Sequence, residues 1–298
     1  MKALYDLPAP AKLNLFLHIT GRRDDGYHLL QSVFMLIDWC DTLHVELRRD
    51  GQLSREDLTT ELPADDLVLR AARALQAHAA PGQGAHIGVA KHVPSQAGMG
   101  GGSSDAATCL LALNRLWGLN LPLSRLAHIG LKLGADVPFF LGGRNAWVEG
   151  VGELLTPVTL PPAHFAVVKP PEGLDTRLIF SATDLQRATP VAIISGFAAD
   201  SESLEATNLK SSVLSDSVFD FGHNDLQPVA QRLCPGVTEA IEWLGALGLK
   251  ARMTGSGSSV FAKLPQAPHE AELPEAPDGW QVRHCSNLET HPLCGWAT

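Results

Sequence analysis

The chain has 298 residues, of which 45% are hydrophobic and 18% charged, enough for two packed domains or one large one. Its net charge of -9 at pH 7 argues against a nucleic acid or an anionic membrane as partner. No apolar run reaches the roughly 18 residues of a membrane span, and the first residues lack the apolar core of a signal peptide. We therefore expect a cytoplasmic protein.

The five cysteines are scattered along the chain, which favours reduced thiols over a disulfide framework. Four possible ligands come close together near the C-terminus: His284, Cys285, His291 and Cys294. Their spacing matches no compact zinc pattern and Pro292 interrupts it, so we expect no protein-held metal ion there.

The first patterned segment, residues 12–19, alternates in the manner of a half-buried strand. One face carries Leu13, Leu15, Leu17 and Ile19. Lys12 and Asn14 share the opposite face, where such side chains in an isolated strand meet solvent more often than a ligand. The next elements expected are a strand over 43–47, a helix over 66–79 and a strand over 85–93.

A glycine-rich loop follows, residues 94–104, with four glycines among positions 98 to 102. Residues 106–117 then have the composition of a helix that stops at Gly118. The first turn of a helix presents unpaired N–H groups and a positive dipole end, so a glycine loop leading into one favours phosphate. A flexible surface loop is the alternative, although linkers rarely precede an apolar helix directly.

The glycine loop differs from two common phosphate-binding motifs. A P-loop needs a lysine after its last glycine, but here Gly102 is followed by Ser103 and Ser104. The dinucleotide fingerprint needs a third glycine where this chain has Ser103. The loop by itself therefore predicts nucleotide binding without indicating the chemistry.

Asp136 lies inside an apolar run, residues 135–140, which comes after a helix expected over 124–133. Such an aspartate is either a cap or turn residue, or a functional acid held in a partly dry place. The residues alone leave both readings open.

The second half restarts with a strand over 165–168 and contains a Ser-rich segment of weak periodicity, residues 190–221. Helices are expected over 225–233 and 237–247, and strands over 250–253, 259–264 and 281–285, with a turn at 254–258. Strands and helices mix without regular alternation, so the fold class is α+β in two lobes. We place the lobes at 1–160 and 161–298.

Three segments in this order resemble the motifs of the galactokinase, homoserine kinase, mevalonate kinase and phosphomevalonate kinase (GHMP) superfamily. They are residues 10–15 (Pro-Ala-Lys-Leu-Asn-Leu), the glycine loop, and residues 254–259 (Thr-Gly-Ser-Gly-Ser-Ser). The resemblance covers essentially the whole chain. Residues 25–28 (Asp-Gly-Tyr-His) and 134–139 are similar to one branch, which phosphorylates a cytidine-diphosphate-linked polyol in the non-mevalonate route to isoprenoids and terpenoids.

The resemblance implies an N-terminal lobe like the second domain of ribosomal protein S5, a ferredoxin-like C-terminal lobe, and an active site in the cleft between them. It implies an ATP-dependent transferase that moves the γ-phosphoryl group to an alcohol. Lys12 and Asp136 would flank the attacking hydroxyl, with Asp136 accepting its proton. Mg²⁺ would arrive with ATP, held mainly by phosphates and water, with Ser103 or Ser104 near it.

The resemblance also assigns binding residues. ATP would contact Leu67, Lys91 and the loop residues Pro94, Ser95, Gln96, Ala97, Gly98, Met99, Gly100, Gly101, Gly102, Ser103 and Ser104. The acceptor substrate would contact Asn14, Tyr27, His28, Phe180, Gly255, Ser256 and Gly257. Asp66 stands where the family usually has an asparagine beside adenine, so the hydrogen bond of that asparagine is not expected here.

Two alternatives remain: another small-molecule kinase of the superfamily, of homoserine or mevalonate type, and a non-catalytic ligand sensor on the same fold. Tyr27 and His28 favour the cytidyl substrate, because homoserine and mevalonate have no base to stack. Retention of both Lys12 and Asp136 argues against a sensor. We expect a monomer or a weak homodimer.

Overall fold

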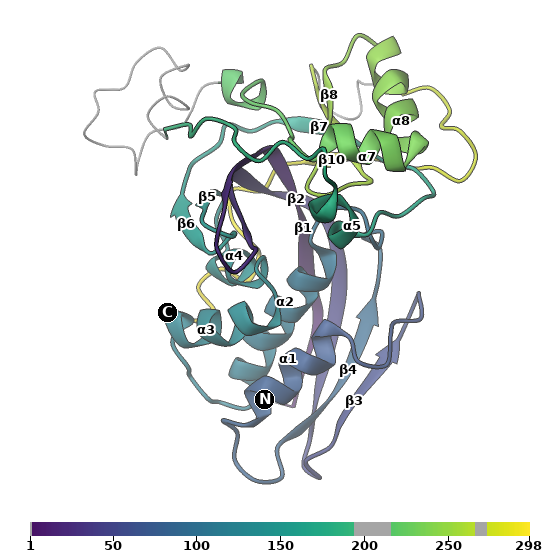
Figure 1. Cartoon of the computed structure of the whole chain (residues 1–298). Coiled ribbons are helices and arrows are strands. Elements are labelled where there is room, and N and C mark those ends of the chain that lie inside the picture. Colours follow the sequence, from purple (N-terminus) through teal and green to yellow (C-terminus); the bar gives the residue numbers. More distant parts are fainter. Residues whose placement is uncertain (1, 194–215, 266–272) are drawn as a thin grey trace.

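The computed structural model describes residues 2–193, 216–265 and 273–298. The described residues form two sheets with their helices, stacked as a lower and an upper lobe (Figure 1). Most of the Ser-rich segment at 190–221 lies outside the described residues. The α+β fold class predicted from the sequence is confirmed.

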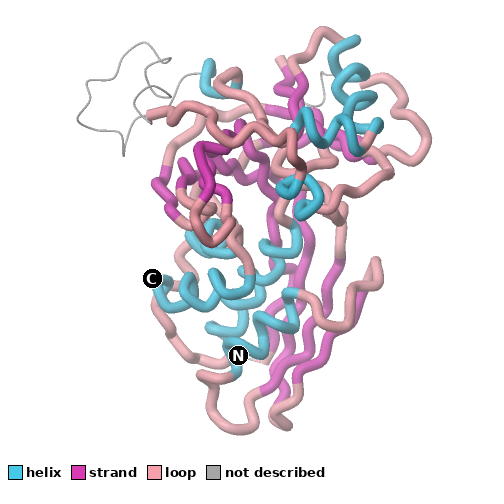
Figure 2. Tube along the Cα trace, viewed as in Figure 1, coloured by secondary structure: helices cyan, strands magenta, loops and turns pink. Residues whose placement is uncertain are grey.

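The first sheet has the strand order β3-β4-β2-β5-β6, and β1 pairs with β2 off this path. Its strands are β1 (Ala3–Arg22), β2 (His28–Arg48), β3 (Leu53–Asp57), β4 (Gly84–Ala90), β5 (Ala146–Glu149) and β6 (Leu154–Pro157). The helices of this lobe are α1 (Leu67–Gln76), α2 (Gly101–Leu116), α3 (Leu123–Leu133) and α4 (Val137–Gly142). They lie together on one side of the sheet (Figure 2).

The second sheet has the order β10-β7-β9-β8 and is antiparallel throughout. Its strands are β7 (His164–Lys169), β8 (Ala251–Met253), β9 (Val260–Leu264) and β10 (Gln281–Ser286). The helices are α5 (Thr176–Ser181), α7 (Gln227–Leu233) and α8 (Pro235–Ala246), with a 3-10 turn, η1 (Asp216–Phe219). Buried residues of α5, α7 and α8 form one apolar cluster with this sheet.

The alternation of side chains along β2 explains how the two sheets join. Phe34 and Leu36 pack with the helices of the first lobe, while Val33, Met35 and Ile37 pack against the second sheet. Because successive strand residues point to opposite faces, β2 is covered on both sides. The first sheet therefore lies between a helical layer and the second sheet.

The same arrangement corrects the predicted half-buried strand. β1 spans 20 residues rather than eight, and Lys12 and Asn14 are only 4% and 1% exposed. The two side chains do share one face, as predicted, but the glycine loop covers it: the N–H of Lys12 donates to the carbonyl of Met99 at 3.0 Å. The expectation that they meet solvent is wrong.

The helix after the glycine loop begins five residues earlier than predicted. Gly101, Gly102, Ser103 and Ser104 lie in the first turn of α2, and the residue before it, Gly100, has a left-handed conformation with φ of 71°. Glycine is disfavoured in the middle of a helix but not where the chain turns into one, so composition placed this boundary too late.

The last residues return to the first lobe. Leu293 packs in the core of that lobe, and the N–H of His291 donates to the carbonyl of Gly143 at the end of α4.

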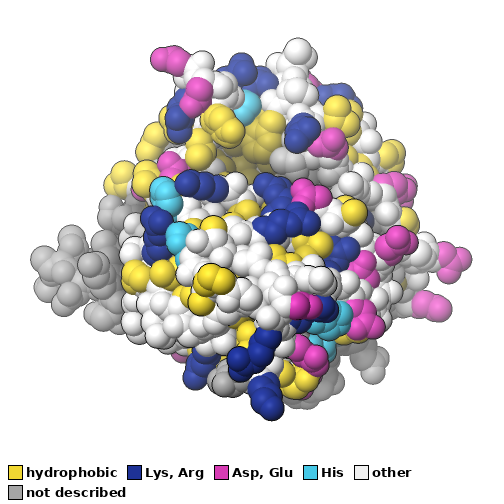
Figure 3. Space-filling view, turned by 90° about the horizontal axis from the view of Figure 1, so that it is seen from below, with side chains coloured by type: hydrophobic (Ala, Val, Ile, Leu, Met, Phe, Trp, Pro, Cys, Tyr) yellow, Lys and Arg dark blue, Asp and Glu magenta, His cyan; other side chains and the backbone are white. Residues whose placement is uncertain are grey.

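The division of the chain at residue 160 stays a prediction. Within the described residues, no helix is both long and apolar enough to cross a bilayer. On the face seen from below, cationic side chains gather near the middle among neutral ones, and acidic side chains lie mainly toward the edges (Figure 3).

Candidate active site

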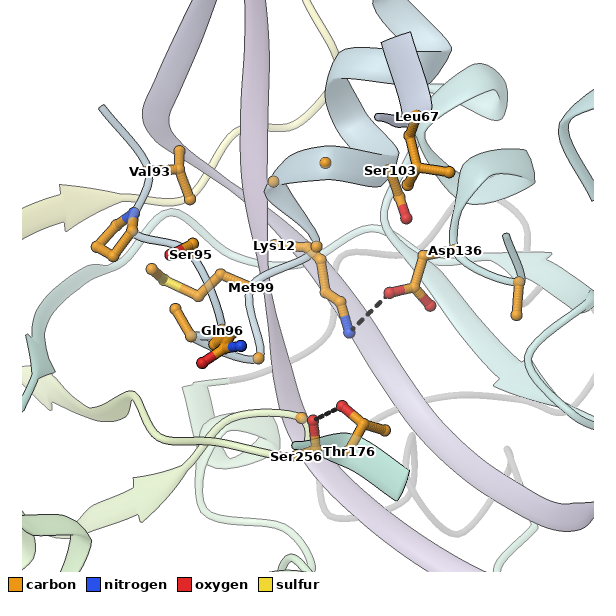
Figure 4. A pocket seen from close by; sticks show the side chains of 18 of the residues that line it. Lys12, Leu67, Val93, Ser95, Gln96, Met99, Ser103, Asp136, Thr176 and Ser256 are labelled. Carbon is orange, nitrogen blue, oxygen red and sulfur yellow. Dashed lines mark hydrogen bonds and ion pairs between the residues drawn. The ribbon is translucent and has the colours of Figure 1, made fainter. Parts of the chain in front are cut away.

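A cavity of about 670 Å³ lies between β1, the glycine loop, the start of α4 and two segments of the second lobe, residues 174–180 and the 254–258 turn. Among its lining residues are most of those that the sequence singled out: Lys12, Asn14, Leu67, Lys91, Pro94 through Ser103, Asp136, Phe180, Gly255, Ser256 and Gly257. Tyr27, His28 and Ser104 are not among them. Figure 4 shows this cavity with Lys12 and Asp136 pointing toward one another near its centre.

Lys12 is held by three contacts. Its Nζ donates to Oδ1 of Asn14 at 2.5 Å, lies 3.7 Å from Oδ2 of Asp136, and sits 4.0 Å from the centre of the Phe34 ring. Burial lowers the pKa of Lys12 below 10.5, and the charge of Asp136 opposes this shift. Its cation therefore faces the cavity in a largely dry setting.

Hydrogen bonds from β1 to the glycine loop, the 254–258 turn and β2 fix the position of this lysine, the first being the bond from the N–H of Lys12 to the carbonyl of Met99. The N–H of Asn14 donates to Oγ1 of Thr254 at 2.8 Å, and its side-chain amide donates to Oγ of Ser32 at 2.9 Å. The bond to Ser32 orients the amide so that its oxygen faces Lys12. One strand thus connects the catalytic candidate to the loops of both lobes.

Asp136 directly precedes α4, but its carboxylate does not cap that helix. Its side chain is 30% exposed and faces Lys12, while Val137, Phe139 and Phe140 of α4 are buried beneath it. The apolar run therefore anchors the short helix and leaves the carboxylate at the cavity. Of the two readings left open by the sequence, this geometry favours a functional acid over a cap.

The glycine loop and the 254–258 turn pack backbone against backbone. The N–H groups of Ser258 and Ser259 donate to the carbonyls of Gln96 and Ala97, each at 3.3 Å. A Cβ on Gly98 would lie 2.3 Å from the carbonyl oxygen of Thr254, well inside any real contact. Glycine is therefore required here, because the two loops of different lobes could not otherwise meet.

The first turn of α2 opens onto the cavity. Gly101, Gly102 and Ser103 line it, and no acidic residue lies in that turn. Its free N–H groups and the positive end of the helix dipole suit an anionic group. Ser103 is the serine that faces the cavity, whereas Ser104 is fully buried behind it.

Lys91 takes part in an ion cluster that the sequence reasoning missed. Its Nζ contacts the carboxylates of Asp41 and Asp105, the latter at 2.6 Å. Oδ1 of Asp41 also accepts from the N–H groups of His92 and Val93 at 2.5 and 2.8 Å. Burial and the nearby Asp41 raise the pKa of Asp105 to about 7. The cluster ties the end of β4 to α2, on either side of the glycine loop.

The signal for that cluster was present in the sequence. Asp41 lies within the apolar strand β2 and Asp105 within the apolar helix α2, and buried carboxylates need a cationic partner. Asp66 has a comparable structural role. It caps α1 by accepting from the N–H of Leu69 at 3.0 Å and pairs with Arg55 at 2.7 Å.

The three side chains expected to bind a base differ in their relation to the cavity. Phe180 lines it, and the ring of His28 packs on Phe180 with 5.1 Å between ring centres. Tyr27 is 63% exposed in the turn between β1 and β2, outside the lining. Thr176, which the sequence reasoning did not single out, lies nearby and pairs with Ser256, which it did, with 2.7 Å between the two hydroxyl oxygens (Figure 4).

The sequence of the whole chain is closely related to known kinases. It is 85% identical over 298 residues to the 4-diphosphocytidyl-2-C-methyl-D-erythritol kinase of Variovorax paradoxus, with all of both chains covered. It is 64% identical to the enzyme of that name from Albidiferax ferrireducens, covering 100% of this chain and 96% of the relative. This chain belongs to the 4-diphosphocytidyl-2-C-methyl-D-erythritol kinase family.

Family models and solved structures agree with this assignment. The GHMP kinases N terminal domain matches residues 66–144, and the GHMP kinases C terminal domain matches 209–276. A crystal structure of 4-(cytidine 5'-diphospho)-2C-methyl-D-erythritol kinase matches with a TM-score of 0.73 and 32% identity, covering 95% of this chain and 98% of that one. Homoserine kinase from Cytophaga hutchinsonii shares the fold, with a TM-score of 0.66 at 14% identity, covering 98% and 96%.

Proposed function

We propose that the chain transfers the γ-phosphoryl group of ATP to the 2-hydroxyl of 4-diphosphocytidyl-2-C-methyl-D-erythritol, giving the 2-phosphate and ADP. The relatives that cover the full chain carry the name of this activity. The structural observation that carries the proposal is the Lys12–Asp136 pair, which faces the same cavity as the glycine loop. The pair would supply a cation and a proton acceptor beside the proposed phosphate site.

In the proposed reaction the acceptor hydroxyl lies between Asp136 and the γ-phosphorus. Its oxygen forms a bond to that phosphorus while the bond from phosphorus to the β–γ bridging oxygen breaks, and ADP leaves with the bridging oxygen. The hydroxyl proton passes to the carboxylate of Asp136 and then to solvent. Phosphoryl transfer is largely dissociative, so it demands little from the base and much from positioning.

Lys12 would stabilise the negative charge that spreads over the transferring oxygens. The superfamily pattern lacks the lysine of a P-loop, and within this cavity Lys12 pairs with Asp136 at 3.7 Å, so its cation lies next to the proposed path of the transferring group. A charge fixed in a dry site costs no reorganisation when the reaction occurs. Its hydrogen bond to Asn14 holds it in place.

The triphosphate would lie along residues 95–103, with the first turn of α2 receiving its charge. Within the described residues, no group of three or more His, Cys, Asp or Glu side chains is placed to hold a metal ion. The hydroxyl oxygen of Ser103, at the cavity, suits Mg²⁺ that is bound mostly by phosphates and water. Such an ion would neutralise charge on the β- and γ-phosphate oxygens.

The acceptor would lie between the lobes, its diphosphate and polyol beside Asn14, Gly255, Ser256 and Gly257. The base would meet Phe180 and His28, with Tyr27 closing over it from the exposed turn. Leu67 would contact adenine, whereas Lys91 would act through its ion cluster with Asp41 and Asp105. The packed rings of His28 and Phe180 favour a cytidyl acceptor over homoserine or mevalonate, which offer no base.

The product tests the proposal. Incubation with ATP, Mg²⁺ and the cytidyl substrate is expected to give one new phosphomonoester on the tertiary carbon that bears the 2-hydroxyl, visible by carbon–phosphorus coupling in NMR. Phosphate on another hydroxyl, or ATP hydrolysis without transfer, would contradict it. The cytoplasmic location and the monomeric or weakly dimeric state stay predictions.

A further inference from the structure

Arg70 of α1 is a charged residue of the cavity lining that has no partner. The acidic side chains of the lining all form ion pairs: Asp136 with Lys12, Asp105 with Lys91, Asp66 with Arg55 and Asp65 with Arg73. These pairs also include the two lysines of the lining. The guanidinium group of Arg70 makes neither an ion pair nor a hydrogen bond with any residue that the structure describes. Among those residues, it is the cation of the cavity that no carboxylate neutralises.

The local sequence of α1 explains why this guanidinium group stays unpaired. An arginine on a helix usually pairs with a carboxylate four residues before it, which here is Asp66. Asp66 instead accepts from the N–H of Leu69 at 3.0 Å and pairs with Arg55 at 2.7 Å. The other helical neighbours of Arg70, at positions 67, 73 and 74, are not acidic. Its face of the helix therefore offers no carboxylate that is still free to pair with it.

Arg70 lies near the first turn of α2. It follows Leu67 by three residues, so the two side chains share one face of α1, and both line the cavity. Leu67 in turn borders the first turn of α2, because a Cβ on Gly102 would lie 3.6 Å from its Cδ1. The unpaired guanidinium group and the free N–H groups of that turn therefore belong to the same part of the cavity.

This part of the cavity lies away from the acceptor side. In Figure 4, Lys12 and Asp136 lie between Leu67 and Ser256, which belongs to the turn proposed to contact the acceptor. Because Arg70 shares the helix face of Leu67, it belongs with Leu67 beyond the reacting pair. A ligand beside Arg70 is therefore the nucleotide rather than the acceptor.

We propose that Arg70 is a nucleotide-binding residue whose guanidinium group binds the α-phosphate of ATP. The inference rests on the proposed function, since it concerns the phosphate donor of that reaction. A guanidinium group offers two parallel N–H donors, which match two oxygens of one phosphate group. The γ-phosphate belongs beside Lys12 and Asp136, and adenine beside Leu67. The α-phosphate is the phosphate next to the nucleoside, so it is the one that a cation near Leu67 meets.

A series of nucleotides tests this assignment. Dissociation constants of adenosine, AMP, ADP and ATP are measured with Mg²⁺ by calorimetry, without any acceptor. In Arg70→Met, Kd for AMP, ADP and ATP should rise about tenfold or more, because all three carry the α-phosphate, while Kd for adenosine should change less than about threefold. An equal loss with adenosine would place the guanidinium group against the base or the ribose. A loss that spares AMP would place it against the β- or γ-phosphate. Either result, or four unchanged affinities, would overturn the inference.

Arg125→Met is the matched control. Arg125 lies in α3 of the same lobe, is exposed and likewise has no side-chain partner among the described residues, but it does not line the cavity. This variant removes an equal charge and should leave all four dissociation constants within about twofold. Equal losses in both variants would show a long-range effect of net charge and contradict a direct contact. Arg70→Lys, which keeps the charge but not the paired donors, should recover part of the affinity for AMP.

The binding assay separates this inference from the proposed function, because it contains no acceptor and needs no turnover. ATP binding by the wild type that Arg70→Met leaves unchanged would overturn the role of Arg70 alone. Wild-type binding of ATP combined with phosphorylation of a different acceptor would overturn the proposed function alone. Absence of ATP binding by the wild type would overturn both.

Discussion

Nζ of Lys12 lies 3.7 Å from Oδ2 of Asp136, although the lysine stands in the middle of the 20-residue strand β1 and the aspartate precedes the six-residue helix α4, far along the chain. The lysine is almost fully buried and the carboxylate is partly open to the cavity. This difference in burial matches different roles: a fixed charge that stabilises the transferring group, and an acceptor that can return its proton to water.

Replacement of Asp136 tests the second role. In Asp136→Asn the side chain keeps its size but cannot accept a proton, so kcat is expected to fall at least about a hundredfold. ATP affinity, measured by calorimetry, should change less than about threefold, because the carboxylate acts on the acceptor. Asp50→Asn, which removes an exposed carboxylate paired with Arg48, is the control. Near-normal turnover in Asp136→Asn would remove this residue from the mechanism.

The pH profile of kcat tests the charge on Lys12. Burial lowers the pKa of its ammonium group below 10.5, so the active, charged form is lost as pH rises through that lowered pKa. The rate should therefore decline on the alkaline side before pH 10.5. In Lys12→Arg, kcat is expected to drop about tenfold or more from altered geometry, but the alkaline decline should disappear because a guanidinium stays charged.

Lys250→Arg provides the comparison for that profile, since Lys250 is 83% exposed and pairs with Asp220 on the surface. It should keep the wild-type alkaline decline. The same decline in Lys12→Arg would show that another group titrates and that Lys12 is not the required cation.

The backbone contact between the glycine loop and the 254–258 turn predicts the effect of adding a single methyl group at Gly98. Gly98→Ala should lower the free energy of unfolding by roughly 1–3 kcal/mol, because φ is 72° and the Cβ would overlap the Thr254 carbonyl. KM for ATP should rise as the loop is displaced. Gly245→Ala in α8 meets nothing within 4 Å and should leave KM unchanged while stability rises by up to about 1 kcal/mol. Equal effects in both variants would contradict the account.

The ion cluster below the glycine loop predicts how stability varies with pH. The pKa of Asp105 is raised from 3.8 to about 7, so between these values the folded protein holds more protons than the unfolded chain. Stability contributed by this group is therefore lost as pH rises through that window. Asp105→Asn cannot ionise. The difference in free energy of unfolding between this variant and the wild type, measured by denaturant titration, should therefore favour the variant more at about pH 8 than at about pH 5. A smaller gain at the higher pH would contradict this.

Local sequence signals predicted much of the fold. Helices and strands of the second half, such as β9 and α8, follow from periodicity and turn residues, and their positions agree with the structure. β1 and β2 are much longer than predicted, because their burial on both faces depends on a second sheet that no local pattern reveals. Tertiary packing, rather than propensity, sets the length of these strands.

Site residues could be predicted where the local sequence pattern itself indicates their role. They could not be predicted where the role depends on partners from distant elements. The glycine loop could be read from its own composition. Lys12 and Asp136 gained their joint role from the resemblance to a family, and the structure brings them together. Asp41 and Asp105 act through contacts across elements, so the sequence alone did not single them out.

The central claim is the identity of the acceptor, and an ADP-release assay on the purified protein tests it most directly. ATP and Mg²⁺ are supplied with equal concentrations of 4-diphosphocytidyl-2-C-methyl-D-erythritol, homoserine or mevalonate. We predict ADP release with the cytidyl substrate, and kcat/KM for the other two at least about a thousandfold lower, because neither fills the base subsite. Turnover of homoserine or mevalonate without turnover of the cytidyl substrate would contradict the proposed function.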